Sequence, residues 1–242
     1  MRWSILAAAI LLLAIGSTSD AAPITFDALD AGVGPGGARP NSDAAAAAFD
    51  LAADNLGLIG LIDFEGLAIG DFGTMVVAPG VTVTLSGTAA SADAGITGTA
   101  GSATLGYNTT ATGANHLRVV PVFDVGTCSA TFDFDRPTEF FGAYLTGLGT
   151  ANGNLHVLFE DGTNQDLSVM GTGSGGVKFF GFTDAGKSIS QVTLELQGVQ
   201  GSRDIFGIDD VRYEIPEPST FAMMALAGLL GGLAYRRRRN RS

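Results

Sequence analysis

Short apolar segments separated by glycine-rich polar turns dominate the chain between residues 58 and 214. Several segments alternate apolar and polar residues, as in Val81-Thr82-Val83-Thr84-Leu85, which is the pattern of a strand with one buried face. The pattern predicts strands at 58–64, 75–77, 81–85, 116–120, 129–135, 138–145, 155–160, 164–170, 177–182, 189–197 and 206–214. Short strands broken by frequent turns are typical of an antiparallel β-sandwich.

One helix is predicted ahead of these strands. Apolar residues recur at helical spacing from Ala45 to Leu56, and we expect Ser42 to be the N-cap and the helix to run to about Asn55. Residues 23–41 are rich in Pro, Gly and small side chains and are expected to be irregular. Residues 22–57 are therefore predicted to form a lead-in and short helix, and residues 58–215 the β-sandwich domain.

The segment 86–114 departs from the strand pattern. It consists largely of Gly, Ala, Thr and Ser, and we expect one weak strand at 103–108 with loops at one end of the sandwich. A run of this length without regular structure inside a domain is usually functional or mobile.

The N-terminus has the pattern of a secretory signal peptide. Met1-Arg2-Trp3 is a short positive region, residues 5–15 are apolar, and small residues follow at 17–22. The apolar region is too short for a permanent membrane anchor, so we predict cleavage after Ala21 and export of the chain.

The C-terminal tail has three parts in a fixed order. Pro216-Glu217-Pro218 comes first, then residues 219–235 carry no charge, and a basic end at 236–241 includes Arg236, Arg237, Arg238 and Arg239. The uncharged segment would span roughly 25 Å as a helix, the short end of a membrane crossing, and the arginines would stop transfer. Residues 216–242 are thus predicted to hold a transmembrane helix at 219–235 and a basic stop.

This tail resembles the PEP-CTERM sorting signal of exopolysaccharide-producing Gram-negative bacteria. The segments 62–67, 179–184, 189–194 and 206–213 are similar to the body of secreted proteins with this tail, whose fold is similar to the jelly rolls of carbohydrate-binding modules. The resemblance implies an exosortase-type processing enzyme and extracellular polysaccharide as partners. Some descriptions of the tail carry an ice-binding label, but that activity needs a flat threonine array, and Thr82 and Thr84 alone do not form one.

Charge and cysteine content narrow the class of protein. Without Arg2, Asp20, Glu217 and the five tail arginines, 7 basic and 22 acidic residues remain, so the net charge of the exported domain is about −15. Such a surface repels nucleic acid and attracts cations, which excludes a nucleic-acid-binding protein. Cys128 is the only cysteine, so no intrachain disulfide can form, and we expect it to be a small buried hydrophobe.

Acidic residues in the first and last predicted strands suggest a metal site. The resemblance to jelly-roll modules implies that these strands lie close together with a structural Ca²⁺ between them, and the candidate ligands are Glu65, Asp209 and Asp210. Adjacent carboxylates in a strand face opposite sides unless the strand bulges there. The alternative is that Asp210 pairs with Arg212 or Arg203, or caps a loop.

Sugar recognition and catalysis are the remaining candidates. Sugar sites use flat aromatic rings with polar neighbours, and the exported domain contains no Trp. Tyr107 is the best ring platform, with Asn108 and Asn115 as polar contacts. No Gly-x-Ser-x-Gly elbow, His-Glu-x-x-His sequence or P-loop occurs, so enzymatic activity is not expected.

The sequence is therefore interpreted as an exported, non-catalytic surface or matrix protein. It would cross the inner membrane of a Gram-negative bacterium and be anchored there, or released to the cell surface or matrix after processing. One alternative is a carbohydrate-binding module that engages exopolysaccharide in biofilm or floc. A secreted hydrolase is the second alternative.

Overall fold

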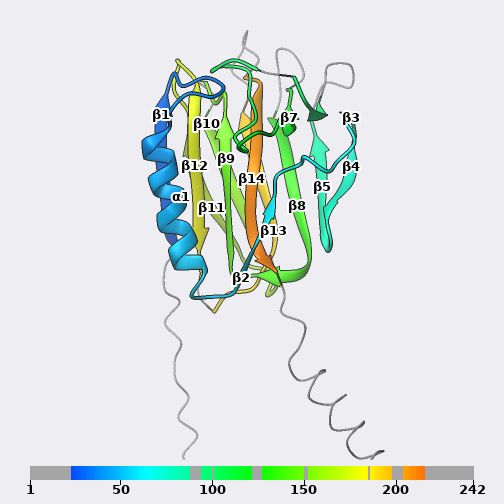
Figure 1. Ribbon diagram of the computed structural model, residues 1–242. Helices are drawn as coiled ribbons and strands as arrows, with labels where there is room; N and C mark the ends of the chain where they lie inside the picture. Colours follow the sequence, from blue (N-terminus) through cyan, green and yellow to red (C-terminus); the bar gives the residue numbers. More distant parts are fainter. Residues whose placement is uncertain are drawn as a thin grey trace, which may run out of the picture.

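The computed structural model describes residues 23–87, 94–99, 101–121, 127–149, 152–184, 186–197 and 204–215 (Figure 1). The predicted signal peptide and the tail from Pro216 onward lie outside these residues. The described part contains one helix, α1 (Pro40–Ala53), and fourteen strands. The strands are β1 (Ile24–Ala31), β2 (Leu58–Ile62), β3 (Gly70–Asp71), β4 (Thr74–Ala78), β5 (Val81–Ser86), β6 (Gly95–Thr97), β7 (His116–Val119), β8 (Thr127–Thr138), β9 (Phe140–Thr146), β10 (Asn152–Phe159), β11 (Asn164–Met170), β12 (Gly176–Thr183), β13 (Ile189–Gln197) and β14 (Phe206–Ile215).

The strands form two antiparallel sheets. Sheet A has the order β1-β12-β9-β14-β7-β6-β3, with β2 also paired to β14, and sheet B has the order β11-β10-β13-β8-β5-β4. The eleven strands expected from the sequence are all present, and the bounds expected for β11 and β13 match the observed ones. Alternation identifies strands such as β5, which buries one face and exposes the other, whereas β9 and β12 are buried along their whole length and read as largely apolar segments.

One apolar core fills the space between the sheets. Phe132 and Leu194 of sheet B are buried against Phe141, Phe180 and Ile208 of sheet A. The rings of Phe132 and Phe141 lie 5.4 Å apart across this core. The prediction of a mainly β, antiparallel sandwich with one short helix is therefore confirmed.

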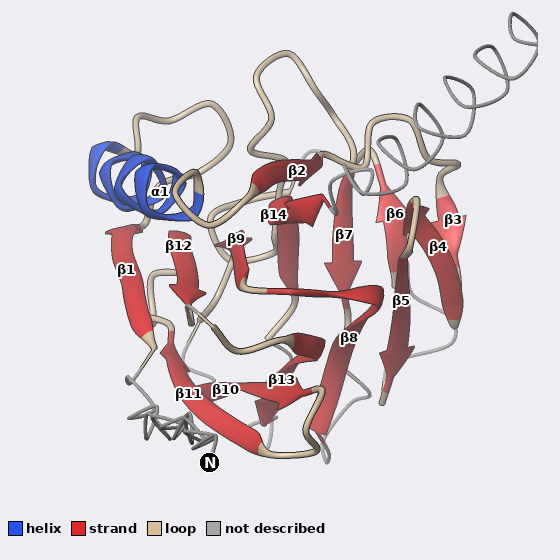
Figure 2. Ribbon diagram, turned by 90° about the horizontal axis from the view of Figure 1, so that it is seen from below, coloured by secondary structure: helices blue, strands red, loops and turns tan. Residues whose placement is uncertain are grey.

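Helix α1 covers the outer face of sheet A and forms a second, smaller core (Figure 2). Phe49 has no exposed surface, and its ring lies 5.5–5.9 Å from the rings of Phe26, Phe140 and Phe179. Phe140 therefore faces the helix, whereas Phe141, the next residue, faces the main core. The adjacent residues Phe140 and Phe141 thus pack into two different cores.

The start of α1 differs from the expected one. Arg39 is the N-cap and Pro40 the first helical residue, where its missing N–H costs nothing, so the prediction of Ser42 as N-cap is wrong. Ser42 is buried, and its backbone N–H donates to Asp30 of β1 at 2.7 Å. Burial alone would raise the pKa of Asp30, but hydrogen bonds from Ser42 and Asn41 hold that pKa below its ordinary value. The preceding strand, β1, therefore supplies the carboxylate that accepts this N–H.

The expectation of an irregular segment at 23–41 is wrong for its first half. β1 pairs with β12 in unbroken register from Ile24 opposite Thr183 to Ala31 opposite Gly176. Asp27, Ala28 and Asp30 have low strand propensity, so β1 exists because β12 offers a partner and α1 covers Phe26. The weak strand expected at 103–108 is also wrong, because those residues form a turn and loop, and the short β6 lies earlier, at Gly95–Thr97.

The registers place both ends of the described chain at one end of the sandwich. Ile24 lies opposite Thr183, which lies opposite Phe140, and the neighbouring Phe141 lies opposite Tyr213 near the end of β14. At the other end, Ala31 lies opposite Gly176. The β1–α1 loop, residues 32–39, therefore starts far from Ile215 (Figure 1).

Candidate functional site

A β-bulge in β14 brings two carboxylates to one side of the strand. Asp209 lies opposite Tyr144 and Arg212 opposite Gly142, so Asp210 and Val211 share a single partner position. Asp210 has a φ of +47°, which is uncommon for a non-glycine residue. Adjacent residues of a regular strand face opposite sides, and this bulge is what allows both carboxylates to face the same side.

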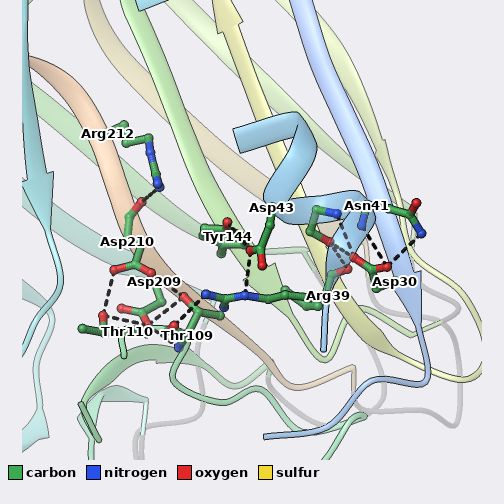
Figure 3. Close-up of polar contacts among 12 residues, drawn as sticks. Asp30, Arg39, Asn41, Asp43, Thr109, Thr110, Tyr144, Asp209, Asp210 and Arg212 are labelled. Carbon is green, nitrogen blue, oxygen red and sulfur yellow. Dashed lines mark hydrogen bonds and ion pairs between the residues drawn. The ribbon is translucent and has the colours of Figure 1, made fainter. Parts of the chain in front are cut away.

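Both carboxylates bind the loop at residues 107–114 (Figure 3). Asp209 Oδ2 accepts the backbone N–H groups of Thr109 at 2.5 Å and Thr110 at 3.1 Å. Asp210 accepts the hydroxyl of Thr110 at 2.7 Å and lies 2.9 Å from that of Thr109. The bulge therefore anchors this loop on the outer face of sheet A.

Asp209 is the most perturbed carboxyl group of the site. Its side chain has no exposed surface, and Oδ1 has no hydrogen-bond partner among the described residues. Burial, and then the neighbouring Asp210 charge, raise the pKa of Asp209 to about 7, although hydrogen bonds from Thr109 oppose the shift. The group therefore titrates near neutral pH.

Arg212 does not neutralise the Asp210 carboxylate. Its Nη1 donates to the backbone carbonyl of Asp210 at 2.8 Å, and its Nε pairs with Asp50 of α1 at 2.7 Å. Ion pairing and loop capping were the alternatives raised from the sequence for Asp210, and the observed contacts are those of a residue that anchors a loop. Arg203, the other arginine considered, lies outside the described residues.

Glu65 holds the far end of the same loop. Its Oε1 accepts the side-chain amide of Asn108 at 2.8 Å and the backbone N–H groups of Ala114 and Asn115 at 2.8 and 2.9 Å. A Cβ on Gly113 would overlap the Glu65 carboxylate, so a larger residue there would displace the end of the Glu65 side chain. Asp63 accepts the backbone N–H of Glu65 at 3.1 Å.

The three residues predicted as calcium ligands, Glu65, Asp209 and Asp210, all bind the loop at residues 107–114. No group of three or more His, Cys, Asp or Glu side chains in the described part of the chain is placed to hold a metal ion. Glu65 is occupied by amides at one end of the loop, and the two aspartates are occupied by threonines at the other. The three carboxylates therefore hold one loop at its two ends, and the calcium site stays a prediction.

The three residues expected to contact sugar have structural partners. Tyr107 is buried, and its hydroxyl donates to the Val33 carbonyl at 2.5 Å, so its ring is not the exposed platform that was predicted. Asn108 donates to Glu65 and to the Asn115 carbonyl, at 2.8 and 2.6 Å. Asn115 is half-buried, with its amide 3.4 Å from the Phe64 carbonyl. All three hold the loop in place.

A cleft of about 440 Å³, here called the loop cleft, lies between this loop and the β1–α1 loop. Its described lining consists of residues 34–37, Arg39, Gly98 and residues 107–114. The Arg39 guanidinium lies 4.4 Å from the centre of the Tyr144 ring, donates to the Thr109 carbonyl at 2.8 Å and pairs with Asp43 at 2.9 Å. Arg39 thereby connects the two walls.

The chemistry of the loop cleft suits a neutral polar ligand. Its described lining offers backbone groups, threonine hydroxyls and one amide, and its single charged side chain, Arg39, is already paired. Ala111 and Thr112 are exposed at its rim. Sequence reasoning missed residues 34–37, Arg39 and Thr109 to Gly113, and the adjacent Asp209 and Asp210 were the only signal that could have pointed to a bulge.

The comparisons add a sorting motif to this picture. A family model described as the PEP-CTERM protein-sorting motif matches residues 214–239, so the chain is a PEP-CTERM motif-containing protein. This signal implies export and membrane-associated sorting in bacteria. The match starts at Glu214, inside β14, and most of it lies outside the described residues. No described helix combines the length and apolar character of a membrane crossing, and the segment expected to do so, 219–235, lies beyond them.

Searches for similar proteins gave structural matches alone. No curated protein matches the chain. The enzymatically active domain of bacteriophage CBA120 tailspike protein 4 aligns with a TM-score of 0.34 and 13% identity, over 56% of this chain and 18% of that one. This chain therefore spans less than a fifth of the tailspike domain.

Two further structures contain the family 11 carbohydrate-binding module of Clostridium thermocellum. The module of the cellulosomal cellulase Lic26A-Cel5E aligns with a TM-score of 0.34 and 7% identity, over 66% of this chain and 96% of the module. The module in complex with a β-1,3-1,4-mixed-linked tetrasaccharide gives a TM-score of 0.34 and 7% identity, over 64% and 95%.

Proposed function

We propose that this protein is an exported, non-catalytic component of the surface or extracellular matrix of a Gram-negative bacterium, delivered by an exosortase-type enzyme. The observation that carries the proposal is the PEP-CTERM sorting motif at residues 214–239. The match begins in the last two residues of β14, so the sandwich is the cargo of the signal. We also propose that the strands of the sandwich are connected in a jelly-roll-like order, as the resemblance to secreted proteins with this tail implies.

The chemistry of the candidate site supports the non-catalytic part of the proposal. In its described lining, the loop cleft has no carboxylate, histidine or cysteine side chain. Cys128 is buried, and burial raises the pKa of its thiol to about 12, which leaves it protonated and a poor nucleophile at neutral pH.

The sorting step is tested in the full chain, expressed in an exosortase-bearing host. Replacing Pro216, Glu217 and Pro218 together by Ala is expected to abolish processing and to leave unprocessed protein in the membrane fraction. Pro35→Ala, in an exposed loop, is the control and is expected to be processed normally. Equal processing of the triple variant, or unchanged processing in a host without exosortase, would overturn the proposal.

The second candidate function is binding of extracellular polysaccharide in the loop cleft. The specific observation in its favour is the neutral lining at residues 107–114, which offers threonine hydroxyls, backbone groups and one amide. Ala111→Arg places a long side chain at the exposed rim and is expected to weaken retention on the producing organism's exopolysaccharide by at least about tenfold. Retention equal to that of the unmodified protein would remove the cleft as the site.

A further inference from the structure

A single line of polar residues crosses all six strands of sheet B. Its members lie directly opposite one another in successive strand pairs: Asp166, His156, Thr193, Thr131, Thr84 and Thr74. The last four place threonines on four adjacent strands, about 4.8 Å apart. We call the whole line of six residues the threonine row.

The threonine row faces away from the core. The neighbours of Thr131 and Thr193 within their strands are buried between the sheets: Ala130, Phe132, Val192 and Leu194. Thr74 is exposed, and Thr84, Thr131 and Thr193 are partly exposed. The described helix lies on sheet A, on the opposite side of the sandwich (Figure 2).

The threonine hydroxyls are ordered but retain bonding capacity. Thr131 and Thr193 Oγ1 lie 3.0 Å apart, and Thr74 and Thr84 Oγ1 lie 3.2 Å apart. Each pair uses one hydroxyl hydrogen, which leaves a second hydrogen and several lone pairs for a partner. The row is therefore a repeated set of donors and acceptors held in register by the sheet.

Polar residues continue on both sides of the threonine row. On one side a parallel line contains Ser168, Asn154, Glu195, Ser129 and Ser86. On the other side, Gln191 lies opposite Asp133, which lies opposite Thr82, and the ends of this line also contain Asn164 and the apolar residues Leu158 and Val76. None of the residues in these three lines is Phe, Tyr or Trp, so a partner would be bound mainly through hydrogen bonds.

Charge selects against a polyanionic partner. Asp166 Oδ1 is bonded to His156 Nδ1 at 2.7 Å, and Asp133 accepts the Gln191 amide at 2.6 Å. His156 is the only cationic candidate in the three lines, and the exported domain carries a net charge of about −15. Such a face repels acidic polymers and matches a partner whose own groups are neutral donors and acceptors.

We propose that the outer face of sheet B, centred on the threonine row, is a contact surface for a long neutral polysaccharide laid across the strands. The proposal rests on the surface or matrix role proposed above and adds a site on the opposite side from the loop cleft. The hydroxyls of an extended sugar chain repeat along its length, as the threonines do across the sheet. Each contact is weak, so affinity comes from many units bound at once.

The test uses the full chain purified in detergent and adsorption to cellulose, β-1,3-glucan, dextran and alginate. We expect adsorption to at least one of the three neutral polymers and none to alginate. Thr131→Val combined with Thr193→Val removes two hydroxyls at nearly constant shape and is expected to weaken adsorption about tenfold, the effect of losing two modest hydrogen bonds. Hexasaccharides of the bound polymer are expected to compete poorly.

Matched variants separate this proposal from the loop cleft. Thr25→Val, on an exposed residue of β1, is the control and is expected to bind as the unmodified protein does. An unchanged thermal midpoint shows that the double variant is folded. Adsorption lost in Ala111→Arg but kept in the double variant overturns the face and leaves the cleft. Adsorption to alginate alone, or to no polymer, overturns the proposal for the threonine row, while retention on the producing organism's exopolysaccharide still reports on the loop cleft and the sorting assay on the surface role.

Discussion

In the acidic pair of β14, Asp209 links the stability of the loop at residues 107–114 to pH. Asp209 is fully buried next to a second carboxylate, yet it accepts two backbone N–H groups of the loop that lines the cleft. The folded chain therefore favours the protonated form of Asp209 while using its oxygen as an anchor. These opposing demands make the residue sensitive to pH.

Stability is expected to depend on pH through Asp209. Its pKa in the folded protein, about 7, lies above the ordinary value of 3.8, so the folded state binds this proton more tightly than the unfolded state. The stabilisation is complete below about pH 4 and is lost as pH rises to about 7; the full difference corresponds to about 4 kcal/mol. Denaturant unfolding measures it.

Asp209→Asn cannot titrate and isolates this contribution. The free energy of unfolding of the variant, relative to the unmodified protein, is expected to rise by a few kcal/mol between pH 4 and pH 7. Asp54→Asn, on an exposed side chain, controls for the loss of one acidic group. A relative stability of Asp209→Asn that stays constant over this range would contradict the expected pKa.

Site residues proved harder to predict than strands, and the reason lies at this scale. Tyr107 was interpreted as an exposed ring because its surroundings are small and polar, but Val33, 74 residues away, accepts its hydroxyl. Asp30 caps α1 from another element, and Glu65 reaches a loop about 50 residues away. No local pattern records contacts of this kind.

At the scale of elements, α1 depends on packing against sheet A. Phe49 is its central contact, between the rings of Phe26, Phe140 and Phe179. Leu51, two residues along, is 72% exposed. The helix therefore offers a buried and an exposed apolar residue within one turn.

Phe49→Ala is expected to destabilise the protein by about 3–5 kcal/mol, because it removes a fully buried ring and leaves a cavity. Leu51→Ala is the matched control and is expected to stay within about 0.5 kcal/mol of the unmodified protein. Chemical denaturation followed by circular dichroism measures both. Equal effects of the two substitutions would mean that α1 does not pack as described.

Strands with a clear apolar pattern were predictable, at an edge or inside a sheet, whereas short strands and strands of low propensity were not. β5, β11 and β13 alternate clearly and were expected close to their observed bounds. β1, β3 and β6 were missed because they are short, glycine-containing or rich in residues of low strand propensity. Their partners in the sheet decide their conformation.

At the scale of the whole molecule, residues 24–53 are part of the sandwich. β1 extends sheet A, and α1 covers the faces of Phe140, Tyr144 and Phe179. A chain that begins at residue 58, the predicted start of the β-sandwich domain, would leave this second core open and make β12 an edge strand.

The fragment 58–215 is therefore expected to be less soluble than 23–215 and to unfold at a lower temperature, with increased binding of a hydrophobic dye. Gel filtration and thermal melts of the two fragments make the comparison. A monomeric 58–215 fragment with the same melting temperature would show that the predicted boundary at 57/58 separates independent units.

The position of β14 also has a mechanical consequence. It is an interior strand of sheet A, bonded to β9 on one side and to β7 and β2 on the other, and it runs directly into the sorting tail. In a protein held by that tail, drag on the distal end pulls β14 along its own axis. The load then falls on both ladders of hydrogen bonds in shear, so many bonds share the force and must break together before the strand is drawn out.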